Sequence, residues 1–208
     1  MFCHNSHLDL LVASSVTALH QLRLPKAMSN AVESLLQHDH ELLNQLLTKL
    51  EKELSQSNVA AAFELLDRFW AGLALHIRAE KLQLFPALTS RAATQSASSF
   101  GPSADEVVDV LTRLRTDHNF FMVELASAIK TMSGLMSGDL TTEESVASVQ
   151  NRLVTLRQRI EAHNRLEEEQ AYEWPAVVLS HSEQAALCER LKRELENLPP
   201  RFDHSSEQ

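Results

Sequence analysis

The chain has few residues that interrupt helices or make tight turns, because its 208 residues include only 4 Gly and 6 Pro. A β-sandwich or a Gly-rich nucleotide-binding fold needs more turn residues than this, so the composition excludes both. Hydrophobic residues make up 44% of the chain, and Leu, Ala, Glu and Gln, which favour helices, are abundant. The sequence therefore predicts an all-α protein that can bury a sizeable core without crosslinks.

Cysteine and positive charge are also scarce. The two cysteines, Cys3 and Cys188, cannot build a disulfide framework, which favours a reducing compartment. The 19 Lys and Arg against 28 Asp and Glu give a net charge of −9, so we expect no nucleic-acid partner. No apolar run is long enough for a membrane span, and no Lys or Arg precedes the first of them as in a signal peptide. These features predict a cytoplasmic protein with no membrane partner.

Turn-prone stretches divide the sequence into helical segments. We expect helices at about 8–22, 29–54, 58–89, 103–132, 141–172 and 180–198. Three of them begin with a capping box, a Ser or Thr followed three residues later by Glu, at positions 103, 141 and 180. Residues 90–102 are expected to form a loop, and the last eight residues a polar tail.

Four of these helices exceed 25 residues, and short connections between such long rods favour antiparallel neighbours. The predicted fold is an antiparallel up-and-down four-helix bundle with a short additional helix at each end. We expect the bundle at residues 29–178, preceded by a tail and short helix at 1–28 and followed by a helix and tail at 179–208.

Each long helix carries an apolar stripe whose members are three or four residues apart. The stripes are Val32, Leu36, His40, Leu43, Leu47, Leu50 and Leu54; Leu66, Phe69, Leu73, His76, Glu80 and Leu84; Val107, Leu111, Leu114, His118, Phe121 and Leu125; and Val149, Leu153, Leu156, Ile160, His163, Glu167 and then Trp174. Six ionisable side chains therefore interrupt four otherwise apolar faces. His38, by contrast, lies off its stripe.

The six ionisable residues follow a repeated order: a single His, then His-x-x-x-Glu, in each half of the chain. The single histidines, His40 and His118, lie in the similar segments LLQHDHELL and RLRTDHNFF. The paired motifs lie in HIRAEKLQLFPAL and HNRLEEEQAYEWPAV. This repetition indicates a duplicated set of ligands, with one helical hairpin supplying each half.

The two carboxylates on the stripes need a positive partner, because burying an unpaired carboxylate costs several kcal/mol. No Lys or Arg lies on the stripes, whereas a metal ion flanked by imidazoles would neutralise Glu80 and Glu167. Four imidazoles and two carboxylates exceed the needs of a tetrahedral zinc site. They suit two octahedral first-row metals that share bridging carboxylates, and nitrogen and oxygen donors without thiolate favour iron or manganese.

The pattern resembles the hemerythrin-like family, also called the HHE cation-binding domain, over about residues 29–177. FPAL after the first paired motif and WPAV after the second resemble the aromatic-Pro signature of that family. The resemblance implies two non-haem iron ions with an oxo or hydroxo bridge, manganese being the alternative. The residues that match the family's ligand positions are His40, His76, Glu80, His118, His163 and Glu167. Ferritin-like di-iron proteins use Glu-x-x-His instead, and no His here has a Glu three residues before it.

The sequence departs from the oxygen-carrying hemerythrins in two ways. Those proteins have a second His one turn after the third-helix His, where this chain has Met122, and an Asp-type ligand where it has Glu167. The arrangement is more similar to the four-His, two-Glu class, which is associated with nitrosative or oxidative stress and repair of damaged iron centres. The second aromatic-Pro pair also lies two residues later than the first, which would fit Glu168 as the ligand. A one-residue step turns about 100° off the stripe, so Glu167 is preferred.

The resemblance implies a protein that binds or reacts with O2, NO or peroxide in stress response, iron-centre repair or iron handling. Whether it turns over as an enzyme stays open. The alternative is a regulatory module that responds to oxygen, redox state or NO and acts through a protein partner, a reading suggested by the two terminal helices.

Several other residues receive a structural interpretation. We expect Tyr172 to close the end of the bundle rather than to take part in redox chemistry, and Phe121 and Met122 to pack. We expect Glu168 and Glu169 to be solvated. Cys3, His4 and His7 could form a second metal site near the N-terminus, but we expect them to belong to a mobile tail instead.

Overall fold

The computed structural model describes residues 31–94, 101–139, 142–198 and 200–202. These residues form helices and no strand, which confirms the all-α prediction. The elements are α1 (Ala31–Ser55), α2 (Val59–Ala79), η1 (Glu80–Leu84), α3 (Phe85–Thr94), α4 (Ala104–Ser137), α5 (Thr142–Leu166), η2 (Glu167–Ala171), α6 (Trp174–Val178), α7 (His181–Leu195) and η3 (Pro200–Phe202). The helix expected at 8–22, with Cys3, His4 and His7, lies outside the described residues.

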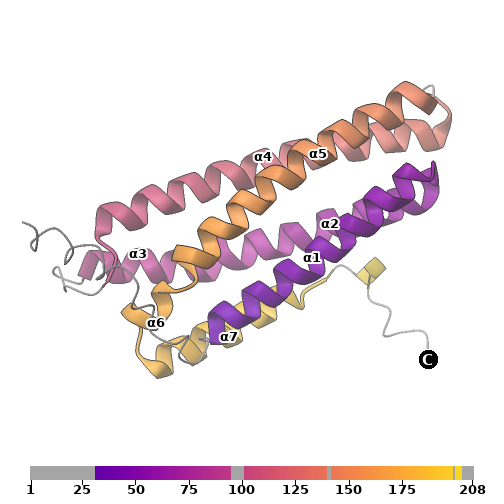
Figure 1. Ribbon diagram of the computed structural model, residues 1–208. Helices are drawn as coiled ribbons and strands as arrows, with labels where there is room; N and C mark the ends of the chain where they lie inside the picture. Colours follow the sequence, from indigo (N-terminus) through magenta and orange to yellow (C-terminus); the bar gives the residue numbers. More distant parts are fainter. Residues whose placement is uncertain (1–30, 95–100, 140–141, 199, 203–208) are drawn as a thin grey trace, which may run out of the picture.

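The long helices α1, α2, α4 and α5 run side by side as a bundle (Figure 1). Helix α1 packs along α2 and α4 along α5, while α2 also contacts α4 and α1 contacts α5. The C-terminal helix α7 lies against α1 and α2 and buries Leu187 and Leu191 there. None of the described helices combines the length and the apolar character that crossing a bilayer requires.

Two apolar clusters fill the bundle, and the predicted stripes supply most of the first and part of the second. The first cluster includes Leu47, Leu50, Leu66, Phe69, Leu125, Val149 and Leu153. The second cluster includes Leu36, Leu84, Phe85, Leu111, Leu114, Tyr172, Leu187 and Leu191. On α1, Leu36 belongs to the second cluster and Leu43 to the first, with His40 between them. On α4, Leu114 belongs to the second cluster and Phe121 to the first, with His118 between them. The buried polar residues therefore lie where the two clusters meet.

Local sequence signals explain several helix ends. Ser103 and Glu106 form a capping box at the start of α4, and Ser180 and Glu183 form one at the start of α7, as predicted. The box expected at Thr141 lies outside the described residues. The expected end of the third long helix near 132 is wrong, because α4 continues to Ser137 and ends at Gly138. Gly138 has φ 78, in the left-handed region that favours glycine and ends helices.

Two short π-helices interrupt the helices that the sequence predicts as continuous. Segment η1 begins at Glu80 and η2 begins at Glu167, the carboxylates of the two paired motifs. The backbone N–H of Phe85 donates to the carbonyl of Glu80, and the N–H of Tyr172 donates to the carbonyl of Glu167. Each bond spans five residues instead of four, which widens the turn and shifts the register of the following residues. Helix α3 then extends to Thr94, five residues into the expected loop.

Candidate metal centre

The structure brings together all six residues that the sequence predicts as ligands. Their side chains are between 0 and 4% exposed, in the middle of the bundle. Four helices contribute, because each stripe turns its polar members toward the bundle axis at the same level. The six residues are His40 from α1, His76 from α2, Glu80 from η1, His118 from α4, His163 from α5 and Glu167 from η2.

One half of the centre lies between α1 and α2. Nε2 of His40 lies 3.2 Å from Nε2 of His76 and 3.2 Å from Oε2 of Glu167. Nε2 of His76 lies 3.7 Å from Oε1 of Glu80. These four atoms form the first half-site.

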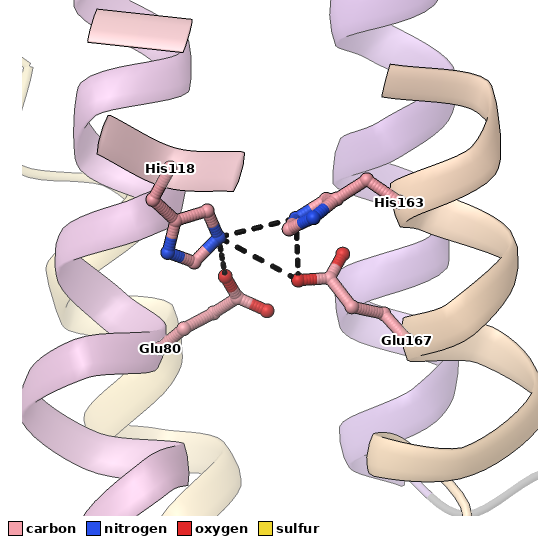
Figure 2. Close-up of side chains that lie close together, drawn as sticks. All are labelled: Glu80, His118, His163 and Glu167. Carbon is pink, nitrogen blue, oxygen red and sulfur yellow. Dashed lines mark hydrogen bonds and ion pairs between the residues drawn. The ribbon is translucent and has the colours of Figure 1, made fainter. Parts of the chain in front are cut away.

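The other half lies between α4 and α5, as Figure 2 shows. Nε2 of His118 lies 3.1 Å from Nε2 of His163 and 3.2 Å from Oε2 of Glu80. Oε1 of Glu167 lies 2.8 Å from Nε2 of His163 and 3.7 Å from Nε2 of His118. These four atoms form the second half-site.

Each carboxylate therefore points one oxygen at each histidine pair. Glu80 directs Oε1 toward His76 and Oε2 toward His118. Glu167 directs Oε2 toward His40 and Oε1 toward His163. A carboxylate shared in this way could bridge two cations, and each histidine pair could supply two imidazoles to one of them.

Acidic residues fix the orientation of three of the four imidazoles. Nδ1 of His76 donates to Asp39 at 2.8 Å, and Nδ1 of His40 donates to Glu168 at 2.9 Å. Nδ1 of His163 lies 3.3 Å from Asp117. A carboxylate on one ring nitrogen leaves the other nitrogen with a free electron pair and raises its basicity, which is the usual support of a metal-bound histidine.

Sequence reasoning missed these supporting acids, although the repeat contains a signal for two of them. An Asp precedes the single histidine of each half, as Asp39 and as Asp117. Glu168 was expected to be solvated, and its contact with His40 shows that this expectation is wrong. The choice of Glu167 for the buried position agrees with the structure, since Glu167 is fully buried and Glu168 is 36% exposed.

The donor set fits a cation. With Nδ1 of His40 and of His76 donating outward, two nitrogen electron pairs face each other at 3.2 Å. Oε2 of Glu80 and Oε1 of Glu167 are buried and make no hydrogen bond among the described residues, although ring nitrogens lie close to both. Facing electron pairs repel one another unless a proton or a metal ion lies between them.

Without metal, protons supply the positive charge. Burial alone would lower the pKa of His40, but hydrogen bonds with Glu167 and Glu168 outweigh it and raise this pKa to about 9. Burial would also lower the pKa of His163. The charge of Glu167 and hydrogen bonds with Asp117 and Glu167 outweigh burial and raise this pKa to about 10. Although burial acts in the other direction, the histidines around Glu167 hold the pKa of its carboxyl well below the usual range.

The expectation that Tyr172 closes the end of the bundle is wrong. This residue is fully buried, and its hydroxyl lies 2.8 Å from Oε1 of Glu80 and 3.1 Å from Oε2 of Glu167. The same oxygen lies 3.2 Å from Nε2 of both His40 and His76. Burial, and then the charges of the two carboxylates, raise the pKa of Tyr172 well above its usual value.

Aromatic rings pack against both imidazoles of the second half-site. The ring of Phe85 stacks on His118 with centroids 5.9 Å apart and an angle of 3° between the planes. Phe121 meets His163 edge-on at 5.1 Å. Met122 packs against the first core cluster, as expected. These contacts hold the imidazoles in an apolar environment, where charge on the carboxylates is least screened.

Two comparisons with known proteins returned nothing: neither the curated proteins nor the solved structures include a match to this chain. A comparison with protein families matched residues 31–175 to the hemerythrin HHE cation-binding domain. The match spans all four long helices and both paired motifs. With its buried cluster of four histidines and two glutamates in a helical bundle, the chain belongs to the hemerythrin HHE cation-binding domain family.

Proposed function

We propose that this protein holds two iron ions in the buried centre and that the di-iron form binds or reacts with O2, NO or peroxide. The observation that carries the proposal is the division of the Glu80 and Glu167 oxygens between two histidine pairs. A single ion would need only one half-site, whereas two half-sites with two shared carboxylates match a pair of ions.

Donor chemistry supports iron over the other common metals. The half-sites offer imidazole nitrogen and carboxylate oxygen without thiolate, a set that suits iron or manganese in octahedral geometry. When bound, a ferrous pair supplies electrons and coordination positions for a small ligand. The chain fixes the ligand geometry through Asp39, Asp117 and Glu168. Phe85 and Phe121 pack against the two imidazoles of the second half-site. The resemblance to the four-His, two-Glu class extends the proposal to a role in stress response, iron-centre repair or iron handling.

Metal analysis tests the proposal. Protein reconstituted anaerobically with ferrous iron is expected to hold about two irons per chain, and exposure to air should produce the near-ultraviolet absorption of a paired ferric centre. The double variant His76→Ala, Glu80→Ala removes one imidazole and one shared carboxylate and should lose both features. Full iron content in that variant would contradict the assignment.

The chain offers a matched control on α1. His38 and Glu41 form an exposed pair at 3.6 Å, with side chains 67% and 72% exposed. The variant His38→Ala, Glu41→Ala removes the same two residue types outside the centre. It should keep the iron content and the absorption of the unmodified protein.

The alternative, a regulatory module that acts through a protein partner, has less structural support. It was suggested by the terminal helices, and the described one, α7, buries Leu187 and Leu191 in the second core cluster. The apolar face of α7 therefore already has an occupant within the bundle.

A further inference from the structure

One difference between the two half-sites bears on where a small ligand binds. A π-helix begins at the Glu of each paired motif, and the fifth residue after the Glu caps the C-terminal end of that π-helix in each case. That residue is Phe85 after Glu80 and Tyr172 after Glu167. The ring of Phe85 offers no donor atom and stacks on His118, whereas the hydroxyl of Tyr172 enters the first half-site.

The hydroxyl of Tyr172 lies within hydrogen-bond distance of four possible metal-ligand atoms. A phenol has one proton to donate, yet its oxygen lies 2.8 to 3.2 Å from two carboxylate oxygens and two imidazole nitrogens. One of these four contacts can be a hydrogen bond donated by Tyr172. When both imidazoles are neutral and donate through Nδ1, the remaining contacts bring electron-rich atoms together, which a cation among them would stabilise.

The distances match those between neighbouring ligands of one octahedral ion. Nitrogen and oxygen donors lie about 2.1 Å from such a metal, so donors at right angles lie about 3.0 Å apart. The Tyr172 oxygen meets this condition with all four atoms of the first half-site. Around those four, His40 also lies 3.2 Å from His76 and from Glu167. Nε2 of His76 lies 3.7 Å from Oε1 of Glu80, so the Tyr172 oxygen is closer to that carboxylate oxygen than the imidazole is.

We propose that the phenolic oxygen of Tyr172 is a fifth protein ligand of the ion in the first half-site, so that an exogenous ligand binds at the ion in the second. The inference rests on the proposed di-iron function. To bind ferric iron, the phenol would lose its proton to the solvent, as other acidic ligands do. The first ion then has five protein donors and the second has four, because Phe85 occupies the position equivalent to Tyr172.

The composition of the chain makes this proposal directly testable, because Tyr172 is its only tyrosine. Full-length protein is produced with ring-deuterated tyrosine, loaded with iron and oxidised in air. Resonance Raman excitation in the visible region is expected to show phenolate ring modes that shift on deuteration. Protein with ring-deuterated phenylalanine is the matched control, and its spectrum should not shift, although Phe85 lies against His118.

The outcomes separate this proposal from the assignment of the centre. An iron content of about two per chain without tyrosine-sensitive modes would overturn ligation by Tyr172 and leave the di-iron assignment standing. An iron content near zero would overturn both. No variant is needed for either result, so a folding defect cannot obscure them.

A variant tests the consequence for exogenous ligands. Azide titration of the ferric protein should saturate at a single azide per iron pair, bound in the second half-site. Tyr172→Phe removes the fifth donor, so the visible phenolate band should be lost and a second azide should bind. Binding of two azides by the unmodified protein would show that Tyr172 leaves the first ion open, contrary to the proposal.

Discussion

Asp39 accepts a hydrogen bond from Nδ1 of His76 at 2.8 Å, although its neighbour in the sequence is His40. In the other half of the chain, Asp117 precedes His118 and contacts His163 at 3.3 Å. Each Asp-His dipeptide therefore supplies a ligand from one residue and orients the ligand of the neighbouring helix with the other. This relationship ties the two helices of each hairpin to the same half-site.

Asp39→Asn should weaken iron binding without unfolding the protein. The amide cannot carry the charge that makes His76 a strong donor, and loss of such a supporting group typically lowers metal affinity by about 10- to 100-fold. Competition with a chelator measures the change. Glu41→Gln is the control, because Glu41 lies on the same helix and the contact that the structure gives for it is with the exposed His38. This variant should leave the iron affinity unchanged. Equal losses in both variants would argue against a specific role for Asp39.

The variants Glu167→Gln and His40→Ala should differ in the amount of iron that they retain. Glu167 gives one oxygen to each half-site, so its replacement should reduce iron at both positions. His40 contacts atoms of the first half-site, so His40→Ala should reduce iron mainly there and leave a partly loaded protein. Iron analysis together with Mössbauer spectroscopy distinguishes the two results. Loss of the same single ion in both variants would contradict a shared carboxylate.

The metal-free protein should become less stable in alkali. His40 and His163 have pKa values raised to about 9 and about 10, above the unfolded value of about 6.5. Their contribution is fully present below about pH 6.5 and is lost as the pH rises through these higher pKa values. The melting temperature of chelator-treated protein should therefore fall between about pH 7 and pH 10.

Iron-loaded protein provides the comparison for this pH dependence. The metal replaces the protons, and because binding requires neutral imidazoles, affinity should rise with pH as protons are released. The loaded protein should thus show a smaller alkaline loss of melting temperature, measured by calorimetry in the same buffers. Parallel curves for the two forms would mean that the histidine protons do not stabilise the metal-free centre.

The positions of the six buried ionisable residues could be predicted because a helical period is a local property. Every member of the four stripes is buried in the structure, since three- and four-residue steps return to one face whatever the neighbouring helices do. The capping boxes at Ser103 and Ser180 are equally local. Contacts such as that between Glu168 and His40 depend on how separate helices meet, which no single-helix pattern contains.

Tyr172 could not be placed because the sequence analysis assumed a regular α-helix. At about 100° per residue, a side chain five residues after Glu167 points about 140° away from it. The π-helix η2 adds a residue to the turn, so the fifth residue returns to the face of Glu167. Phe85 reaches the centre after Glu80 in the same way through η1. A change of one residue per turn therefore decides which aromatic side chains enter the site.

His118 differs from the other three histidines of the centre in its hydrogen bonding. The sequence repeat suggests a substitution that would supply the missing partner. Nδ1 of His118 is buried and has no hydrogen-bond partner among the described residues. In the first half of the repeat, Lys81 follows Glu80, where the second half has Glu168 after Glu167. Since Glu168 supports His40 at 2.9 Å, Lys81→Glu is expected to place a carboxylate near His118 in the equivalent way.

Lys81→Glu should therefore slow the loss of iron to a chelator, by about 10-fold if the new contact matches an ordinary supporting carboxylate. Lys81→Gln is the matched control, because it removes the positive charge without supplying an acid. If both variants retained iron equally well, the gain would come from removing the charge of Lys81 near the centre rather than from a hydrogen bond to His118. If neither changed the rate, the two halves of the repeat would not be equivalent at this position.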